Sequence, residues 1–227
     1  MKKLLALVPL LLCPLAHADM AYHSVEEFVE SEFARDAKLD LCHVSSDYPT
    51  NQRCGVGTTG AQAKPIVAGL LASRSEGTAF VFVLSRHTGN HYHLTEKSAP
   101  FPFGQLADRW IGVEALSVEA NDRFRIQFKS NPRGLPERPD SDLYRFKAID
   151  GQWRVIGLDH AGMVRCDDGS YGDGDSYSAN FVTGKVLAGK TKDCQPTAVE
   201  THRIQFPAFK LSDFVPLDSR YRPPVSP

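Results

Sequence analysis

The stretch LYRFKAIDGQWRVIGL, residues 143–158, decides the fold of this chain. Two runs rich in aromatic and β-branched residues flank the pair Asp150-Gly151. Asp-Gly is a preferred pair for a two-residue type I′ turn, because both central residues of that turn take a positive φ. The stretch therefore predicts an antiparallel hairpin. Trp153 and Val155 alternate along its second strand, so they share one face and are expected to pack in the core.

Similar signals recur on both sides of this hairpin. Residues 123–129 alternate apolar and polar side chains after the turn Asn121-Asp122, as a half-buried strand does. The run AFVFVL, residues 79–84, is apolar throughout and predicts a central strand covered on both faces. Such signals add up to about ten strands. They predict an all-β protein, mainly antiparallel, folded as a sandwich or a strongly curled sheet, with propeller-like hairpin repeats as the alternative.

One amphipathic helix is expected before the strands. Ser24 can cap it, and Glu27, three positions later, completes the pattern of a capping box. Apolar residues then recur at helical spacing from Val25 to Ala37. The prediction is a single helix that packs on the β domain.

The N-terminus has the layout of a secretory signal. A short basic start precedes an apolar run, and small residues precede Asp19. The apolar run is shorter than the roughly 20 residues that a membrane-spanning helix needs. We predict a signal peptide over residues 1–18 and a single β-rich domain over residues 19–227 that ends in a proline-rich tail. The expected location is the periplasm, with the extracellular space as the alternative.

The charge balance disfavours two classes of partner. Lys2 and Lys3 leave with the signal, so 24 basic residues face 27 acidic ones and the net charge is about −3. A chain this close to neutrality has no overall field that attracts nucleic acid or anionic lipid, although a local basic patch remains compatible with it. The sequence predicts no nucleic-acid partner, no membrane span and no cofactor.

Four cysteines remain after the signal is removed: Cys42, Cys54, Cys166 and Cys194. An even number of cysteines in an exported protein predicts two disulfides. Three pairings are open, and Cys42–Cys54 with Cys166–Cys194 is favoured, because each pair flanks a short loop-like stretch. None of them has the CxxC spacing of a redox motif or a structural zinc site.

A histidine-rich hairpin is the one candidate metal site. His87, His91 and His93 surround a predicted turn, and positions 91 and 93 share a face on a strand. Two imidazoles at this spacing suit zinc or copper. Hairpin pairing is expected to bring Arg86 to the same face, however, where its charge would repel a cation. No carboxylate nearby in the sequence supplies a third ligand.

Two other polar patterns favour a structural interpretation. The run DDGSYGDGD, residues 167–175, has no frame that fits a calcium-binding EF-hand loop, and its composition suits a wide turn. Asp159 and His160 are adjacent, so on a strand they face opposite ways and do not pair with each other. The motifs of common hydrolases and of nucleotide-binding loops are missing from the sequence. Their absence favours a protein that is not an enzyme.

A long loop is the candidate contact site for a partner. Residues 130–142, SNPRGLPERPDSD, contain three prolines and no apolar periodicity. Loops of this length inside a compact domain are often functional. Arg133, Glu137 and Arg138 are its candidate partner-binding residues. The alternative is a solvated connection between strands.

Two hairpins carry a faint resemblance to known proteins. The run YRFKAIDGQWRVIGLD (144–159), followed by SANFVTGKV (178–186), resembles a pattern found in signal-bearing, largely uncharacterised bacterial periplasmic proteins. The resemblance covers about a fifth of the chain. It implies a bacterial envelope protein with no defined activity, and it assigns no catalytic residue.

Three functions fit these observations. The first is an exported, non-enzymatic binding protein of the inhibitor or immunity type, which acts on another envelope or secreted protein. The second is a metal-dependent or hydrolytic enzyme centred on the His87, His91 and His93 hairpin. The third is a structural component of the envelope. The oligomeric state does not follow from the sequence.

Overall fold

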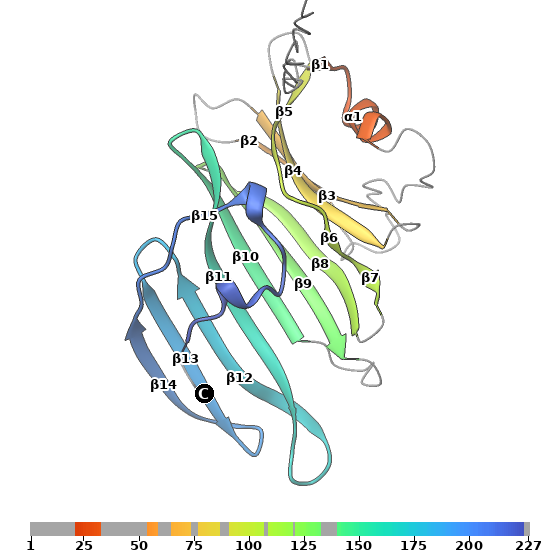
Figure 1. Cartoon of the computed structure of the whole chain (residues 1–227). Coiled ribbons are helices and arrows are strands. Elements are labelled where there is room, and N and C mark those ends of the chain that lie inside the picture. Colours follow the sequence, from red (N-terminus) through yellow and green to blue (C-terminus); the bar gives the residue numbers. More distant parts are fainter. Residues whose placement is uncertain are drawn as a thin grey trace, which may run out of the picture.

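The computed structural model describes residues 21–32, 54–58, 65–73, 77–86, 91–106, 109–119, 121–132 and 140–224. Within these ranges every strand pair is antiparallel, and the strands form two sheets. Figure 1 shows the two sheets and the elements that cover them. The predicted fold, a mainly antiparallel all-β protein, is therefore confirmed. Its two sheets pack against each other.

The smaller sheet, called sheet A, has the spatial order β1-β5-β4-β3-β2, and β6 pairs with β4. Its strands are β1 (Ala21–Tyr22), β2 (Cys54–Thr58), β3 (Pro65–Ser73), β4 (Thr78–Arg86), β5 (Tyr92–Lys97) and β6 (Phe101–Pro102). The helix α1 (Val25–Glu32) lies between β1 and β2 in the sequence.

The larger sheet, called sheet B, has the order β14-β13-β12-β11-β10-β9-β8-β7, and β15 pairs with β11. Its strands are β7 (Gly104–Gln105), β8 (Arg109–Glu119), β9 (Arg123–Pro132), β10 (Asp140–Ile149), β11 (Gln152–Arg165), β12 (Tyr171–Asn180), β13 (Lys185–Lys192), β14 (Gln195–Arg203) and β15 (Phe209–Lys210). Two short 3-10 helices, η1 (Leu211–Asp213) and η2 (Ser219–Tyr221), follow β15.

Turn chemistry sets the hairpins of sheet B. Asp150 and Gly151 have φ values of 51° and 75°, as a type I′ turn requires. Asn121 and Asp122, between β8 and β9, have φ values of 64° and 55°. Trp153 is buried beside Val155, as their alternation predicts.

The central strand of sheet A is covered on both sides, as its apolar sequence predicts. Val81 and Val83 of β4 belong to the main core, which lies between the two sheets. Phe80, Phe82 and Leu84 belong to a second core on the opposite face of the sheet.

The helix α1 packs over that second core. The backbone N–H of Glu27 donates to Ser24 Oγ at 3.1 Å, so the helix begins at the predicted cap. Phe28 is fully buried, and its ring lies 4.9 Å from that of Phe82. The predicted helical turns beyond Glu32 lie outside the described residues. No helix in the described part of the chain is long and apolar enough to cross a membrane.

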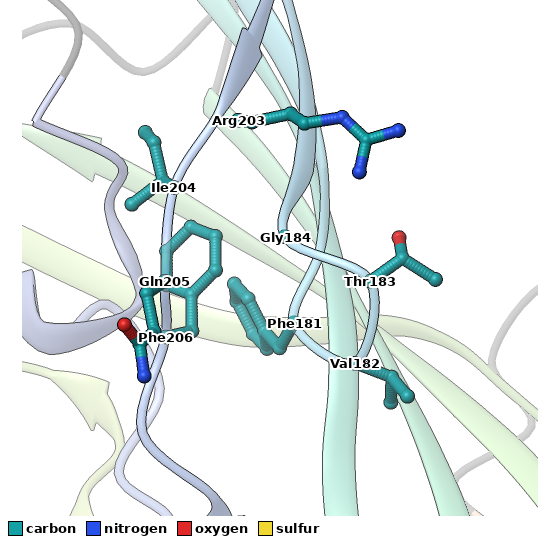
Figure 2. Close-up of a pocket in the computed structure, with 8 residues that line it drawn as sticks. All are labelled: Phe181, Val182, Thr183, Gly184, Arg203, Ile204, Gln205 and Phe206. Carbon is teal, nitrogen blue, oxygen red and sulfur yellow. The ribbon is translucent and has the colours of Figure 1, made fainter.

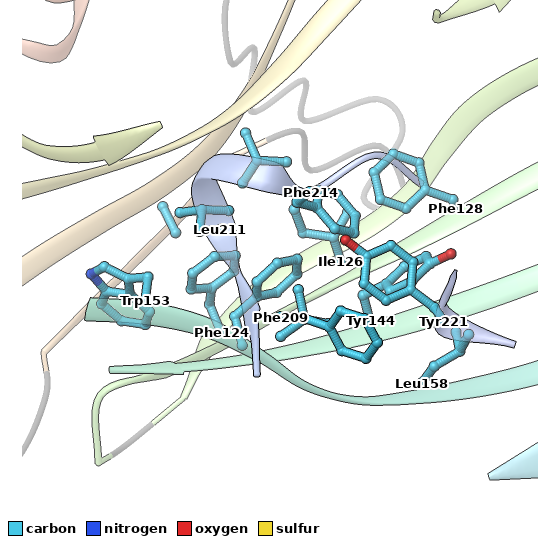
Figure 3. Close-up of a cluster of buried hydrophobic side chains, with 14 of the residues drawn as sticks. Phe124, Ile126, Phe128, Tyr144, Trp153, Leu158, Phe209, Leu211, Phe214 and Tyr221 are labelled. Carbon is cyan, nitrogen blue, oxygen red and sulfur yellow. The ribbon is translucent and has the colours of Figure 1, made fainter. Parts of the chain in front are cut away.

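The C-terminal segment packs on sheet B. It includes part of the predicted proline-rich tail: residues 209–224 cross the face of sheet B and complete the main core. Figure 3 shows the side chains of Phe209, Leu211, Phe214 and Tyr221 over those of the sheet. Most of the segment is irregular, so its buried aromatic residues follow no fixed period that a sequence pattern would show.

One carboxylate joins the two sheets and the C-terminal segment. Glu96 of β5 accepts a hydrogen bond from the backbone N–H of Trp153 in β11 at 2.9 Å. Its other oxygen accepts from the backbone N–H of Ser212 in η1 at 3.2 Å. Both backbone N–H groups therefore have an acceptor, and the shared carboxylate holds β5, β11 and η1 in fixed relative positions.

Sheet A and the C-terminal segment cover only part of sheet B. We call β8 to β11 the covered half and β12 to β14 the outer half (Figure 1). Large apolar side chains of the covered half, such as Phe124 and Phe128, are almost completely buried. In β14, by contrast, every side chain except that of His202 is exposed.

Candidate functional site

The predicted histidine site is only partly described. His87 lies outside the described residues. His91 directly precedes β5 and His93 lies in it, and the ring of His23 lies 4.6 Å from that of His91. No group of three or more metal-ligating side chains with the geometry to hold an ion occurs in the described ranges. Metal binding at His91 and His93 therefore stays a prediction.

The expected position of Arg86 was wrong. Arg86 pairs with Tyr92, and His93 pairs with Ser85. Directly opposed residues share a face, so Arg86 lies on the face opposite to that of His93. Five residues separate Arg86 from Tyr92 in the sequence, and this odd number places Arg86 opposite Tyr92 instead of opposite either histidine.

The predicted disulfide Cys166–Cys194 is confirmed, with a Cα–Cα distance of 5.6 Å. It joins the end of β11 to the turn between β13 and β14, where Asp193 and Cys194 take positive φ values. Cys42 lies outside the described residues, so its pairing with Cys54 stays a prediction. Instead of one wide turn, the 167–175 run forms a tight turn from Cys166 to Ser170, and β12 begins at Tyr171.

The predicted partner-binding residues Arg133, Glu137 and Arg138 lie outside the described residues. The loop that contains them is shorter than predicted, because β9 continues to Pro132 and β10 begins at Asp140. The two strands remain paired up to Asp140 and Ser130. The ends of both strands carry polar side chains, so no apolar pattern in the sequence predicted that the strands extend this far.

A buried polar cluster lies where the C-terminal segment crosses sheet B. Asp142 of β10 is fully buried, and its Oδ1 lies 2.6 Å from His160 Nδ1 of β11. A carboxylate only accepts hydrogen bonds when it is ionised, so Nδ1 of the imidazole is the donor. The two residues are directly opposed in the strand register.

Two further side chains close this cluster. Arg222, which follows η2, donates through Nη2 to Asp142 Oδ2 at 3.3 Å and through Nη1 to the Tyr177 hydroxyl at 3.1 Å. The rings of His160 and Tyr177 are stacked, with centroids 4.9 Å apart. Burial raises the pKa of Tyr177 above its ordinary value, so the phenol stays neutral.

The cluster resembles half of a catalytic triad, since an Asp orients a His that is itself nearly buried. Its remaining partner, however, is a cation from the C-terminal segment. Arg222 satisfies the second oxygen of Asp142, which would otherwise be a buried unpaired charge. We conclude that this cluster fastens the C-terminal segment, through Arg222, to sheet B.

Sequence reasoning did not find this pair. The prediction that Asp159 and His160 face opposite ways agrees with the structure, because Asp159 pairs with Arg145 at 2.7 Å whereas His160 pairs with Asp142. Asp142 is 18 positions away from His160. A regular count back from the Asp150-Gly151 turn would place Asp159, not His160, opposite Asp142. A register shift between Arg145 and Phe146 moves the pairing by one residue, and no pattern in the sequence marks that shift.

A shallow pocket of about 290 Å³ lies at the end of the outer half. It is lined by Phe181, Val182, Thr183, Gly184, Arg203, Ile204, Gln205 and Phe206. Figure 2 shows the turn between β12 and β13 on one side and the segment after β14 on the other. Asn180 shapes this turn, because its Oδ1 accepts from the backbone N–H groups of Val182 and Thr183 at 3.0 and 2.9 Å.

Exposed valines mark the same half of the sheet. Val182 in the turn is 65% exposed, and Val199 in the edge strand β14 is 71% exposed. β14 pairs with β13 on one side, and no described strand pairs with it on the other. An edge of this kind presents backbone hydrogen-bonding groups that another chain can use.

No protein-family model matches the chain, and no curated protein or solved structure is significantly similar to it. The class that the fold defines is a two-sheet antiparallel β protein with a half-covered larger sheet.

Proposed function

We propose that this chain is an exported, non-enzymatic binding protein of the inhibitor or immunity type, which acts on another protein through the outer half of sheet B. The observation that carries the proposal is the open edge strand β14, whose side chains are exposed over almost its whole length. Edge strands accept a strand from a partner through backbone hydrogen bonds, and neighbouring pockets then select its side chains.

The geometry of the outer half supports this mode of binding. The shallow pocket lies beside the end of β14, and Ile204 and Phe206 supply an apolar lining. Val182 and Val199 are apolar residues that water surrounds in the isolated chain. Burying them against a partner would remove apolar surface from water, which favours association.

Rigidity supports it as well. The Cys166–Cys194 bond fixes the turn at the start of β14. A preorganised surface loses little conformational entropy on binding, and that raises affinity. The disulfide also agrees with an oxidising compartment, where such bonds persist. The periplasm is the compartment that we propose.

The proposal is tested by affinity capture with three forms of the protein. The wild type, Val182→Ser/Val199→Ser and the control Val164→Ser are immobilised, and proteins retained from periplasmic and secreted extracts are identified by mass spectrometry. Val164 is a matched control, because it is another exposed valine, 41% exposed, at the disulfide end of β11. None of these changes alters the charge.

We expect one saturable partner that the wild type and Val164→Ser retain equally. The double variant should bind it roughly ten-fold more weakly, as the loss of central apolar contacts does at other interfaces. A partner retained equally by all three forms, or no saturable partner at micromolar concentrations, would contradict the proposal. Deleting residues 133–139 in a fourth form tests the predicted contact loop with Arg133, Glu137 and Arg138.

A further inference from the structure

The outward face of sheet B carries a row of uncompensated positive charge. Four cations oppose one another across adjacent strands β9, β10, β11 and β15. The register pairs Arg123 with Lys147, Lys147 with Arg154, and Arg154 with Lys210. We call these four residues the basic row.

The basic row faces away from the core. Phe124, Phe146, Trp153 and Phe209, which are the sequence neighbours of the four cations, point into the main core. Successive side chains of a strand alternate between faces, so the cations point outward. Arg123 and Lys210 are exposed, and Lys147 and Arg154 are partly buried between them.

Adjacent strands lie about 4.8 Å apart, so the row places four charges within about 15 Å. Like charges that oppose each other directly destabilise a sheet. No carboxylate in the described ranges pairs with any of the four. Glu119, which opposes Arg123 at the end of the row, pairs instead with Arg125 at 3.3 Å.

The other cations of this face show the contrast. Arg145 pairs with Asp159 at 2.7 Å, and Lys129 pairs with Glu114. These ion pairs balance their own charges and leave the basic row unbalanced. In addition, Arg154 Nε is buried and has no hydrogen-bond partner in the described part of the chain. An unsatisfied buried donor of a cation is costly and is best satisfied by an anion.

We infer that the basic row is the docking site for an acidic surface of a protein partner. A small anion would meet one or two of these cations, whereas a row across four strands matches carboxylates spread over a surface or a segment. Partly exposed apolar residues flank the row on the same face, among them Ile149. Interfaces between proteins combine charged and apolar contacts in this way.

Position links this site to the proposed function, on which the inference rests. Gly157, three residues after Arg154, pairs with Asn180. Asn180 shapes the turn that lines the pocket of the outer half. Arg203 of that pocket is opposed by Lys185, a further pair of like charges. One acidic partner could therefore contact the basic row and the outer half together.

The test uses poly-L-glutamate of about 20 residues as the probe for acidic protein, with fluorescence anisotropy at low and high salt. The row variant is Lys147→Gln/Arg154→Gln. The control is Arg165→Gln/Lys192→Gln, which removes the same charge from exposed positions near the disulfide. A single-stranded oligonucleotide and anionic phospholipid vesicles are measured in parallel. Thermal unfolding checks that every form is folded.

We expect the wild type to bind poly-L-glutamate, with an affinity that falls as salt rises. The row variant should bind roughly five-fold more weakly, and the control should stay near the wild type. The row variant should also be at least as stable as the wild type, because a repulsion has been removed. Unfolding would therefore not explain its loss of binding.

No binding of poly-L-glutamate by the wild type, or equal binding by the row variant, would overturn the inference. Tighter binding of the oligonucleotide or the vesicles than of poly-L-glutamate would overturn it in favour of that other class of partner. Failure here leaves the proposed function standing if the captured partner still depends on Val182 and Val199. If the capture experiment fails while poly-L-glutamate still binds, the outer half is no longer supported as a binding site, whereas the basic row is.

Discussion

The covered half and the outer half of sheet B belong to one hydrogen-bonded sheet, yet they are held in different ways. In the covered half, large aromatic side chains such as Phe124, Phe128 and Tyr144 have at most 1% of their surface exposed. In the outer half, β14 is exposed on both faces. The ion pair of Lys190 with Glu200 at 3.0 Å connects β13 to β14, and the disulfide connects the end of β11 to the turn before β14.

This difference separates two tasks within one sheet. Burial of aromatic residues supplies most of the stability of such a domain, because apolar surface leaves the water. The outer half extends the same backbone ladder with less burial: Phe181 and Val186 belong to the main core, whereas the side chains of β14 are exposed and available to a partner. The C-terminal segment marks the boundary between the two halves, and its Arg222 donates a hydrogen bond to the Tyr177 hydroxyl of β12.

The largest expected effect comes from removing an aromatic ring of the C-terminal segment. Phe214 is fully buried, and its ring contacts those of Phe101, Phe128, Tyr144, Phe146 and Tyr221. Phe214→Ala should lower the free energy of unfolding by about 3–5 kcal/mol, because folding then buries less apolar surface and leaves a cavity where the ring was. Urea denaturation measures this change.

Val199→Ala in the outer half is the control for that substitution. Val199 is 71% exposed, so its truncation should change the free energy of unfolding by less than about 0.5 kcal/mol. Similar losses in the two variants would mean that the outer half contributes to the core and that the comparison is wrong.

The sequence predicted the covered half much better than the outer half, and the reason is the same difference in burial. Phe124, Ile126 and Phe128 alternate with polar residues because one face of β9 is buried. β14, with the sequence QPTAVETHR, has no buried face, so no alternation marks it and no sequence pattern predicts this strand. The register that joins Asp142 to His160 depends on a tertiary pairing that periodicity alone does not reveal.

The next effect tests whether the Asp142 cluster fastens the C-terminal segment. Asp142→Asn keeps the shape of the side chain but removes the charge that His160 and Arg222 share. We expect a loss of about 2 kcal/mol in the free energy of unfolding. The loss is smaller than for Phe214→Ala because the Arg222 side chain is 37% exposed and keeps contact with water.

Asp159→Asn is the matched control for the Asp142 cluster. Asp159 also forms an ion pair, with Arg145, but both side chains are 35% exposed. Exposed pairs contribute about 0.2–1 kcal/mol, so this variant should lose less than Asp142→Asn. Hydrogen exchange adds a local measurement, in which Asp142→Asn should speed exchange around η2. An Asp142→Asn variant that is no less stable than Asp159→Asn would show that the cluster does not fasten the segment.

The smallest effect concerns alkaline pH. Burial raises the pKa of Tyr144 and Tyr177 above the ordinary value and raises the pKa of Tyr221 to about 12. All three lie where the C-terminal segment crosses the sheet. Below pH 10 these phenols are neutral in both the folded and the unfolded chain. Above pH 10 the unfolded chain loses their protons first, so stability falls as the pH rises, and for Tyr221 the fall extends from about pH 10 to about pH 12.

Tyr221→Phe isolates one of these groups, because all lysines and the other tyrosines titrate equally in both proteins. Urea denaturation at several pH values from 8 to 11 would compare the two. Above pH 10 the wild type should lose stability faster than Tyr221→Phe, by at most about 1.4 kcal/mol per pH unit. Equal slopes would mean that Tyr221 ionises as readily in the folded chain as in the unfolded chain. The C-terminal segment would then open before the rest of the sheet, and the ring of Tyr221 would not contribute to the covered half as its burial indicates.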